Sequence, residues 1–153
     1  MINIIYADYL RTVLLFVLFL FLFLISFSDI KKQQIPDLYI GIIGITGVIL
    51  EYEYLNIEIK SVIYGMLSIG IFMILCAMVW KKSFGGGDIK LMRVSSGFLG
   101  FKGVWTAFLL GVILAFPQAL YIKYSGKKDR YFPIGQYLCI GIFVHIIRIV
   151  YKG

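Results

Sequence analysis

The chain has 153 residues, of which 61% are hydrophobic and 17% aromatic, and its mean hydropathy is +0.93. This composition leaves too little polar surface to coat a soluble globule of this size, so it excludes a soluble domain and predicts an integral membrane protein within the lipid bilayer. The net charge of +7 does not predict a nucleic-acid partner, because Lys and Arg form short clusters between hydrophobic runs instead of one basic face.

Six hydrophobic segments predict an all-α, polytopic membrane protein with about six transmembrane helices. A helix needs roughly 20 residues to cross the hydrocarbon core, so the second segment is marginal and the fourth is short. The fourth can cross if the glycines before it enter the membrane through protein-lined space, and five spans are otherwise expected. In chain order the segments cover about residues 9–28, 38–55, 61–80, 88–100, 103–124 and 132–151.

The first segment is predicted to be a helix of the mature protein and not a secretory signal peptide. It is too long for a signal peptide and has neither a basic leader nor a small-residue cleavage site. Because no linker, low-complexity tract or internal repeat divides the chain, residues 1–153 are expected to form a single domain.

The basic residues predict which side of the plasma membrane each loop faces. Ten of the fifteen Lys and Arg residues lie near the loops that follow the first, third and fifth segments. By the positive-inside rule these loops face the cytoplasm, and both termini face the outside. The ten residues are Lys31, Lys32, Lys81, Lys82, Lys90, Arg93, Lys123, Lys127, Lys128 and Arg130.

Two aspartates occupy matching positions at the predicted cytoplasmic ends of hydrophobic segments. Asp29 follows the first segment, and Asp88 follows three glycines at the start of the fourth. An ionisable side chain in such a segment is functional by default. Two carboxylates that a fold brings together share a proton, so one can take a proton from water while the other polarises a carbonyl group. Asp29 and Asp88 are therefore the candidate catalytic residues of an aspartyl protease.

Five neighbouring residues are candidates for substrate binding: Gly85, Gly86, Gly87, Lys90 and Pro36. The glycines leave room for an extended substrate backbone and permit a positive φ. Lys90 and the helix dipole both favour the anion of Asp88, which is expected to ionise more readily than Asp29. Pro36 directs the chain into the second helix, which Asp37 is expected to cap. The simpler interpretation is a flexible glycine turn with an N-cap aspartate, and the presence of Asp29 argues against it.

No metal or organic cofactor is expected. Cys76 and Cys139 are single residues in apolar runs, and the chain has no Cys-x-x-Cys motif. His145 is the only histidine and lies in the middle of a hydrophobic segment. It is interpreted as a hydrogen-bonding residue of the helix bundle and not as a metal ligand.

The aspartate motifs resemble those of a known family. Gly85-Gly86-Gly87-Asp88-Ile89-Lys90-Leu91-Met92 resembles the Gly-x-Gly-Asp motif of type IV prepilin peptidases, and Asp29, six residues and then Pro36-Asp37 resembles the first aspartate motif of that family. Residues 132–138 resemble more loosely the segment that opens the family's last helix. The similarity runs from roughly Phe21 to Gly141, in the expected order.

The resemblance implies an aspartyl endopeptidase that cleaves the leader of a prepilin, pseudopilin or archaellin. The implied substrate has a basic leader, a glycine before the cleaved bond and a hydrophobic helix after it. Larger members carry an N-terminal extension with Cys-x-x-Cys motifs that is associated with N-methylation. This chain lacks those motifs, so it resembles the short peptidase core that serves Tad-type pili or archaellins.

A second hypothesis belongs to another functional class. The chain could be a non-enzymatic membrane subunit or a small proton-coupled carrier whose carboxylates relay protons. A relay can keep part of its function when glutamate or histidine replaces an aspartate, whereas a protease dyad should tolerate neither replacement.

Overall fold

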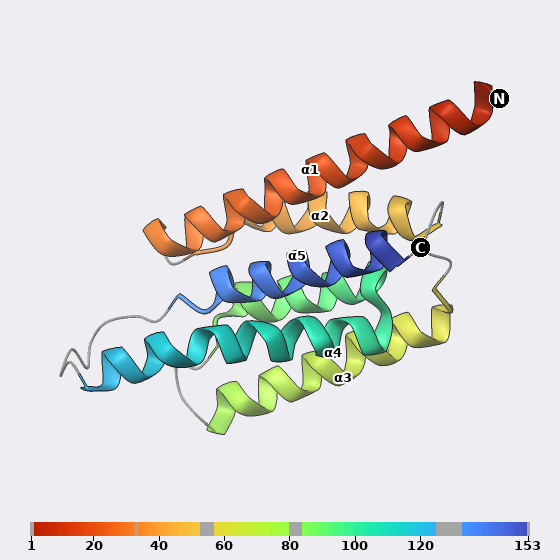
Figure 1. Ribbon diagram of the computed structural model, residues 1–153. Helices are drawn as coiled ribbons and strands as arrows, with labels where there is room; N and C mark the ends of the chain where they lie inside the picture. Colours follow the sequence, from red (N-terminus) through yellow and green to blue (C-terminus); the bar gives the residue numbers. More distant parts are fainter. Residues whose placement is uncertain (1, 33, 53–56, 80–83, 125–132, 153) are drawn as a thin grey trace.

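The computed structural model describes residues 2–32, 34–52, 57–79, 84–124 and 133–152. This part of the chain is helical and contains no strand, which confirms the predicted all-α class. The helices lie roughly side by side as a bundle (Figure 1). They are α1 (Ile2–Lys32), α2 (Asp37–Leu50), α3 (Ile59–Val79), α4 (Gly86–Tyr124) and α5 (Gly135–Lys152).

The α4 helix is divided at Gly100, where φ is 67° and ψ is −175°. The rings of Phe84, just before the first arm, and Phe108, in the second arm, have centroids only 5.9 Å apart. In a straight helix, 24 residues would separate them by roughly 36 Å. The chain therefore reverses at Gly100, and the second arm runs back beside the first (Figure 1). These two arms correspond to the predicted segments 88–100 and 103–124.

Three helical stretches are long and apolar enough to cross a membrane, judged by length and composition: Tyr9–Lys31, Ile59–Val79 and Gly86–Ile122. Two shorter apolar helices, Asp37–Leu50 and Gly135–Tyr151, accompany them. The third stretch contains the reversal at Gly100. The chain is thus a membrane protein, and the count of six spans stays a prediction.

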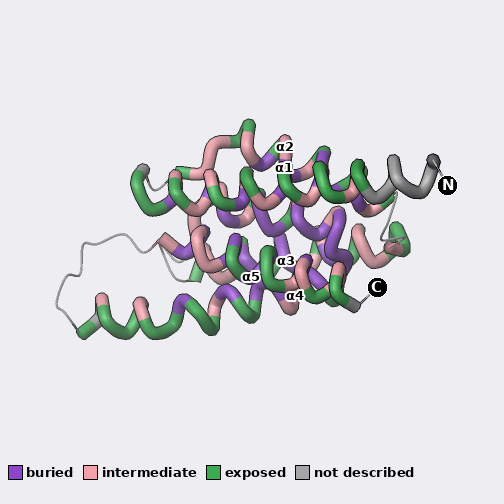
Figure 2. The backbone as a smooth tube through the Cα atoms, turned by 45° about the horizontal axis from the view of Figure 1, so that its top comes forward, coloured by how far each residue is buried: buried purple, intermediate pink, exposed green. Residues whose placement is uncertain are grey.

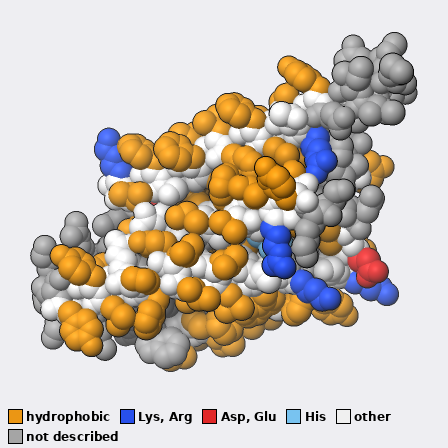
Figure 3. Space-filling model, viewed as in Figure 1, with side chains coloured by type: hydrophobic (Ala, Val, Ile, Leu, Met, Phe, Trp, Pro, Cys, Tyr) orange, Lys and Arg blue, Asp and Glu red, His pale blue; other side chains and the backbone are white. Residues whose placement is uncertain are grey.

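Small residues allow the helices to pack closely. A Cβ added to Gly47 of α2 would lie 2.0 Å from the Phe98 ring of the first arm of α4, and one added to Gly141 of α5 would lie 2.1 Å from the Ala107 carbonyl oxygen of the second arm. Glycine at such positions lets membrane helices approach one another. Figure 2 shows the buried residues along the inward faces of the helices. Figure 3 shows that much of the visible outer surface is hydrophobic, as expected for a surface in lipid.

Half of the ten basic residues used to predict the orientation lie outside the described residues. They are Lys81, Lys82, Lys127, Lys128 and Arg130. Two of the ten basic residues, Lys90 and Arg93, lie inside the first arm of α4 and not in a loop. The orientation therefore depends on the sequence pattern.

Replacing Gly100 by alanine is expected to destabilise the protein by at least about 1–2 kcal/mol, because an L-residue at positive φ is strained. The added Cβ would also lie 2.8 Å from Ser61 Oγ and 2.9 Å from Ile57 Cγ2. A lower Tm of the purified protein in detergent would report this loss. Gly41→Ala is the matched control, since a Cβ there meets no atom within 4 Å. Equal Tm values for the two variants would contradict the role assigned to Gly100.

Candidate active site

The two aspartates come together where the ends of three helices meet. Asp29 lies in the last turn of α1 and Asp88 in the first turn of α4, and each side chain is only 2% exposed. Both lie against Gly135, the first residue of α5. A Cβ built on Gly135 would be 2.7 Å from Asp88 Oδ1 and 2.8 Å from Asp29 Oδ2. Because one oxygen of each carboxyl group is this close to the same point, the two groups are immediate neighbours.

The Asp88 carboxyl group is held by the backbone that precedes it. The Gly85 amide donates a hydrogen bond of 2.9 Å to Asp88 Oδ2, and the Ile89 amide donates to the Gly85 carbonyl. This arrangement resembles half of a capping box, in which a side chain in the first turn reaches back to the N-cap amide. The other oxygen, Asp88 Oδ1, is buried and has no hydrogen-bond partner among the described residues. That oxygen is left for a proton, water or substrate.

The Asp29 carboxyl group is held by α5, more than one hundred residues along the chain. The Gln136 amide donates a hydrogen bond of 3.2 Å to Asp29 Oδ2. Free amides at a helix N-terminus and the helix dipole both favour a carboxylate there. Each aspartate therefore faces the N-terminus of a helix, α4 for Asp88 and α5 for Asp29. The helix dipole therefore no longer supports the prediction that Asp88 ionises more readily than Asp29.

A cavity of about 370 Å³ opens beside the two aspartates. Four of the five predicted substrate-binding residues line it, and Pro36 does not. Pro36 is instead the N-cap of α2, with φ −64° and ψ 130°, and its carbonyl accepts hydrogen bonds from the Tyr39 and Ile40 amides. The lining consists of Asp29, Gln34, Ile35, Asp37, Gly85, Gly86, Gly87, Asp88 and Lys90.

Lys90 forms its ion pair with Asp37 and not with Asp88. Its ammonium group lies 2.8 and 2.9 Å from the two carboxylate oxygens of Asp37, in an exposed ion pair at the rim of the cavity. The cap predicted for Asp37 is also wrong, since α2 has no side-chain cap and Asp37 is the first residue inside the helix. Lys90 and Asp37 thus link the starts of α4 and α2. Exposed ion pairs contribute little to the stability of a protein. The Lys90–Asp37 pair is therefore of interest for its position at the rim of the cavity and not for its strength.

The glycines of the motif differ from one another in their surroundings. A Cβ on Gly86 would meet no atom within 4 Å, whereas one on Gly87 would lie 2.9 Å from Ile35 Cβ. The positive φ considered for this turn is not found, because Gly100 is the only glycine with a positive φ in the described part of the chain. Gly87 therefore permits close packing of α4 against the connection between α1 and α2, which also lines the cavity.

Gly135 and Gln136 are site residues that the sequence motifs do not predict. The segment from residue 132 was noted for its loose resemblance to the start of the family's last helix, and Phe132 itself lies outside the described residues. A glycine directly at the start of an apolar helix was the available signal. Gln118, in the second arm of α4, accepts hydrogen bonds from the side chains of Gln136 and Tyr137 and so holds this turn of α5.

The described residues hold no group of three or more His, Cys, Asp or Glu side chains that could bind a metal ion. Cys76 and Cys139 are free thiols. His145 lies 2.8 Å from the Thr106 hydroxyl through Nδ1, which confirms its predicted role as a hydrogen-bonding residue between helices.

Sequence comparison agrees with this arrangement. Residues 16–120 match the type IV leader peptidase family, and this region contains both aspartates and the three glycines. The chain belongs to the type IV leader peptidase family. Membership implies a protease that acts on prepilin-like substrates. No curated protein and no solved structure matches the chain. The match ends before α5, so the contribution of Gly135 and Gln136 comes from the structure alone.

Proposed function

We propose that this protein is a membrane aspartyl endopeptidase that removes the leader of a prepilin, pseudopilin or archaellin at the cytoplasmic face of the plasma membrane. The observation that carries the proposal is the pair of buried carboxyl groups that both lie against Gly135. Family membership favours this function over that of a proton-coupled carrier.

The pair would act as one acid and one base. Neighbouring carboxyl groups do not both ionise readily, so they share a proton. The ionised group removes a proton from the attacking water, and the protonated group donates a hydrogen bond to the scissile carbonyl oxygen. When the tetrahedral intermediate collapses, a carboxyl group returns a proton to the leaving amine. The Gly85 amide holds one oxygen of Asp88, and the Gln136 amide holds one oxygen of Asp29. These hydrogen bonds fix the two carboxyl groups for this exchange of protons.

The cavity of about 370 Å³ suits the leader side of the cleaved bond, because it joins the aspartates to the exposed Lys90 and Asp37. Gly85 and Gly87, which add no side chain to the wall of this cavity, leave room for an extended backbone beside Asp88. The hydrophobic helix of the substrate would lie in the bilayer beside the enzyme.

Leader cleavage tests the proposal directly. The protein would be coexpressed with a prepilin-like protein that has a basic leader, a glycine and a hydrophobic helix, and the size of that protein would be followed on a gel. A shift to the mature size that requires this chain is the expected result. Failure to process any such substrate from pilus or archaellum systems would count against the peptidase function.

The proposed orientation places the aspartates on the cytoplasmic side, by the distribution of Lys and Arg. Single cysteines placed near Lys82 and Lys128 should be protected from a membrane-impermeant thiol reagent, while one at Gly153 should react from outside. If the cysteines near Lys82 and Lys128 are protected, a cytoplasmic Gly153 would mean that the last predicted segment does not cross the membrane, and this would contradict the count of six.

Gly87→Val is expected to reduce leader cleavage far more than Gly86→Val. Valine at position 87 must displace Ile35, and overpacking of this kind costs about 1–3 kcal/mol. Because Ile35 lines the cavity, the displacement alters the site. A Cβ added at position 86 meets no atom within 4 Å. The measurement is the cleavage rate per inserted molecule, and equal losses for the two variants would indicate that this turn is only a flexible linker.

A further inference from the structure

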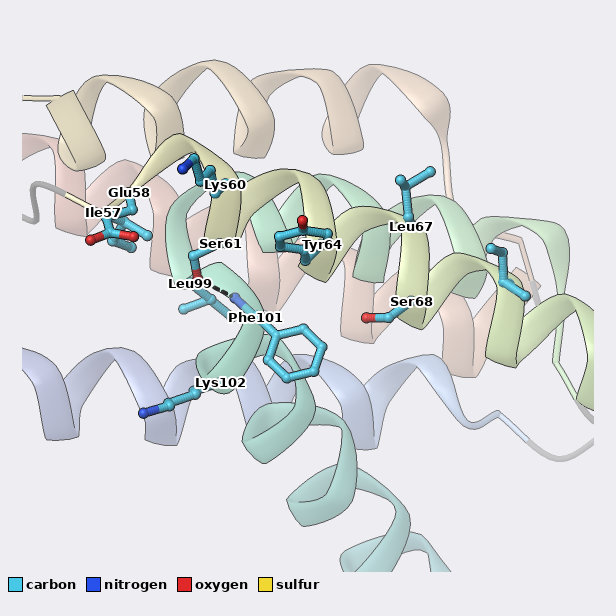
Figure 4. Close-up of a pocket in the computed structure, with 11 residues that line it drawn as sticks. Ile57, Glu58, Lys60, Ser61, Tyr64, Leu67, Ser68, Leu99, Phe101 and Lys102 are labelled. Carbon is cyan, nitrogen blue, oxygen red and sulfur yellow. Dashed lines mark hydrogen bonds between the residues drawn. The ribbon is translucent and has the colours of Figure 1, made fainter.

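The bundle contains a second and larger cavity, of about 930 Å³, at the end opposite the aspartates. It lies between the first half of α3 and the reversal of α4 (Figure 4). Twelve residues of helix separate Asp88 from Gly100, a rise of roughly 18 Å. The cavity is thus separate from the candidate active site. It is lined by Ile57, Glu58, Lys60, Ser61, Tyr64, Leu67, Ser68, Ile71, Leu99, Phe101 and Lys102.

Hydrogen bonds fix the wall of this cavity. The Phe101 amide donates to Ser61 Oγ over 2.9 Å, and the Trp105 indole nitrogen donates to Ser68 Oγ over 3.1 Å. Gly65 lets the backbone at Gly100 and Phe101 approach α3, since a Cβ there would lie 3.2 Å from their atoms. Both serine hydroxyls are therefore engaged with α4, and apolar surface makes up most of the wall.

Charged and apolar residues are separated along the cavity. Glu58, Lys60 and Lys102 lie at one end, and Leu67 lies towards the other (Figure 4). In the described part of the chain neither Lys60 nor Lys102 forms an ion pair, and these two lysines outnumber Glu58, the one carboxylate in the lining, so this end of the cavity carries a net positive charge. Tyr64 and Leu67 are 65% and 51% exposed, so the apolar part opens outward towards the surrounding lipid.

We propose that this cavity binds one glycerophospholipid of the membrane, with its phosphate at Lys60 and Lys102 and an acyl chain along Tyr64, Leu67 and Phe101. The separation of charge matches an amphipathic molecule with an anionic head and a long apolar tail. Basic pockets between membrane helices attract lipid headgroups for the same reason. In a bilayer the apolar part cannot remain empty without losing contacts that an acyl chain supplies. The proposal does not depend on the peptidase activity.

Native mass spectrometry of the full-length protein in mild detergent tests the proposal with three added probes at equal concentration. Dioleoyl phosphatidylglycerol should bind one to one. Dioleoylglycerol, which lacks the phosphate, and glycerol phosphate, which lacks the chains, should each bind much less. Tight binding of glycerol phosphate would assign the site to a free phosphate compound, and equal binding of dioleoylglycerol would remove the role of the lysines. Either result would overturn the proposal.

Substitutions locate the site. Lys60→Ala and Lys102→Ala should each weaken phosphatidylglycerol binding about five-fold, from roughly 1 kcal/mol for each basic residue at a lipid headgroup. Arg148→Ala is the matched control, because Arg148 is a basic residue of α5 outside the cavity. Unchanged binding in both lysine variants would contradict the proposal.

A competing occupant is the hydrophobic helix of a substrate. Benzoylphenylalanine placed at Leu67 should crosslink to phospholipid in cell membranes on illumination. A crosslink to a coexpressed prepilin-like protein, without one to lipid, would assign the cavity to substrate and overturn the lipid proposal. Lipid binding is measured without substrate, so its outcome is independent of whether leader cleavage is found.

Discussion

Asp29→Ala and Asp88→Ala are each expected to lower leader cleavage by at least about 100-fold, because each removes half of an acid and base pair. Both side chains are buried next to each other, so neither can be replaced by a water-exposed group nearby. The amount of inserted protein should change little, since alanine removes a buried polar group without adding bulk. The measurement is the rate of conversion of a coexpressed prepilin-like protein, divided by the amount of inserted enzyme.

Three variants make this result specific. Asp37→Asn should be mild by comparison, because Asp37 is exposed and paired with Lys90 at the rim. Asp29→Glu and Asp88→Glu should be nearly as inactive as the alanine variants, because a longer side chain moves the carboxyl group out of the pair. Normal processing by Asp88→Ala would contradict the peptidase proposal, and substantial function in the glutamate variants would favour a proton relay.

The helices could be predicted from the sequence because they coincide with long runs of apolar residues. The predicted segments 9–28 and 61–80 correspond to α1 and α3, and the end of the fourth segment at residue 100 coincides with the reversal in α4. The reversal itself was foreseeable from the gap between two apolar segments. Its cause was not, because the φ of Gly100 depends on packing against Ser61 and Ile57 of a distant part of the chain.

The candidate site was predicted in its chemistry but only partly in its geometry. Asp29 and Asp88 stood out because carboxyl groups are rare in apolar segments. Lys90 was assigned to Asp88, two residues away, whereas its ammonium group lies on Asp37, which is 53 residues away. Sequence proximity alone does not identify the partner of a long side chain, because the fold brings Asp37 to Lys90 from 53 residues away.

The start of α5 was the part of the site that local sequence could not reveal. Gly135 and Gln136 carry no ionisable group, so nothing in their chemistry marks them as functional. Their importance comes from position: one amide holds Asp29 and one missing side chain leaves room for both carboxyl groups. Three helix ends from distant parts of the chain have to pack before this arrangement exists.

Gly135→Ala is therefore expected to be as damaging as the loss of an aspartate, although alanine adds only one methyl group. Its Cβ would lie 2.7 Å from Asp88 Oδ1 and 2.8 Å from Asp29 Oδ2, closer than such contacts allow. Neither carboxyl group can move away freely, because the Gly85 amide holds Asp88 and the Gln136 amide holds Asp29. Either the pair separates or the first turn of α5 shifts, and a displacement of about 1 Å in an active site can cost 100-fold in rate.

Cleavage rate per inserted molecule is again the measurement, and Gly86→Ala is the matched control, because Gly86 lines the same cavity but has no atom within 4 Å of an added Cβ. Gly135→Ala should lose about 100-fold in cleavage, while Gly86→Ala stays close to the parent protein. The amount of inserted protein should be similar for both, since the clash is confined to one turn. Near-normal cleavage by Gly135→Ala would mean that the working enzyme does not hold its two carboxyl groups against the start of α5, and the acid and base pair would then need another geometry.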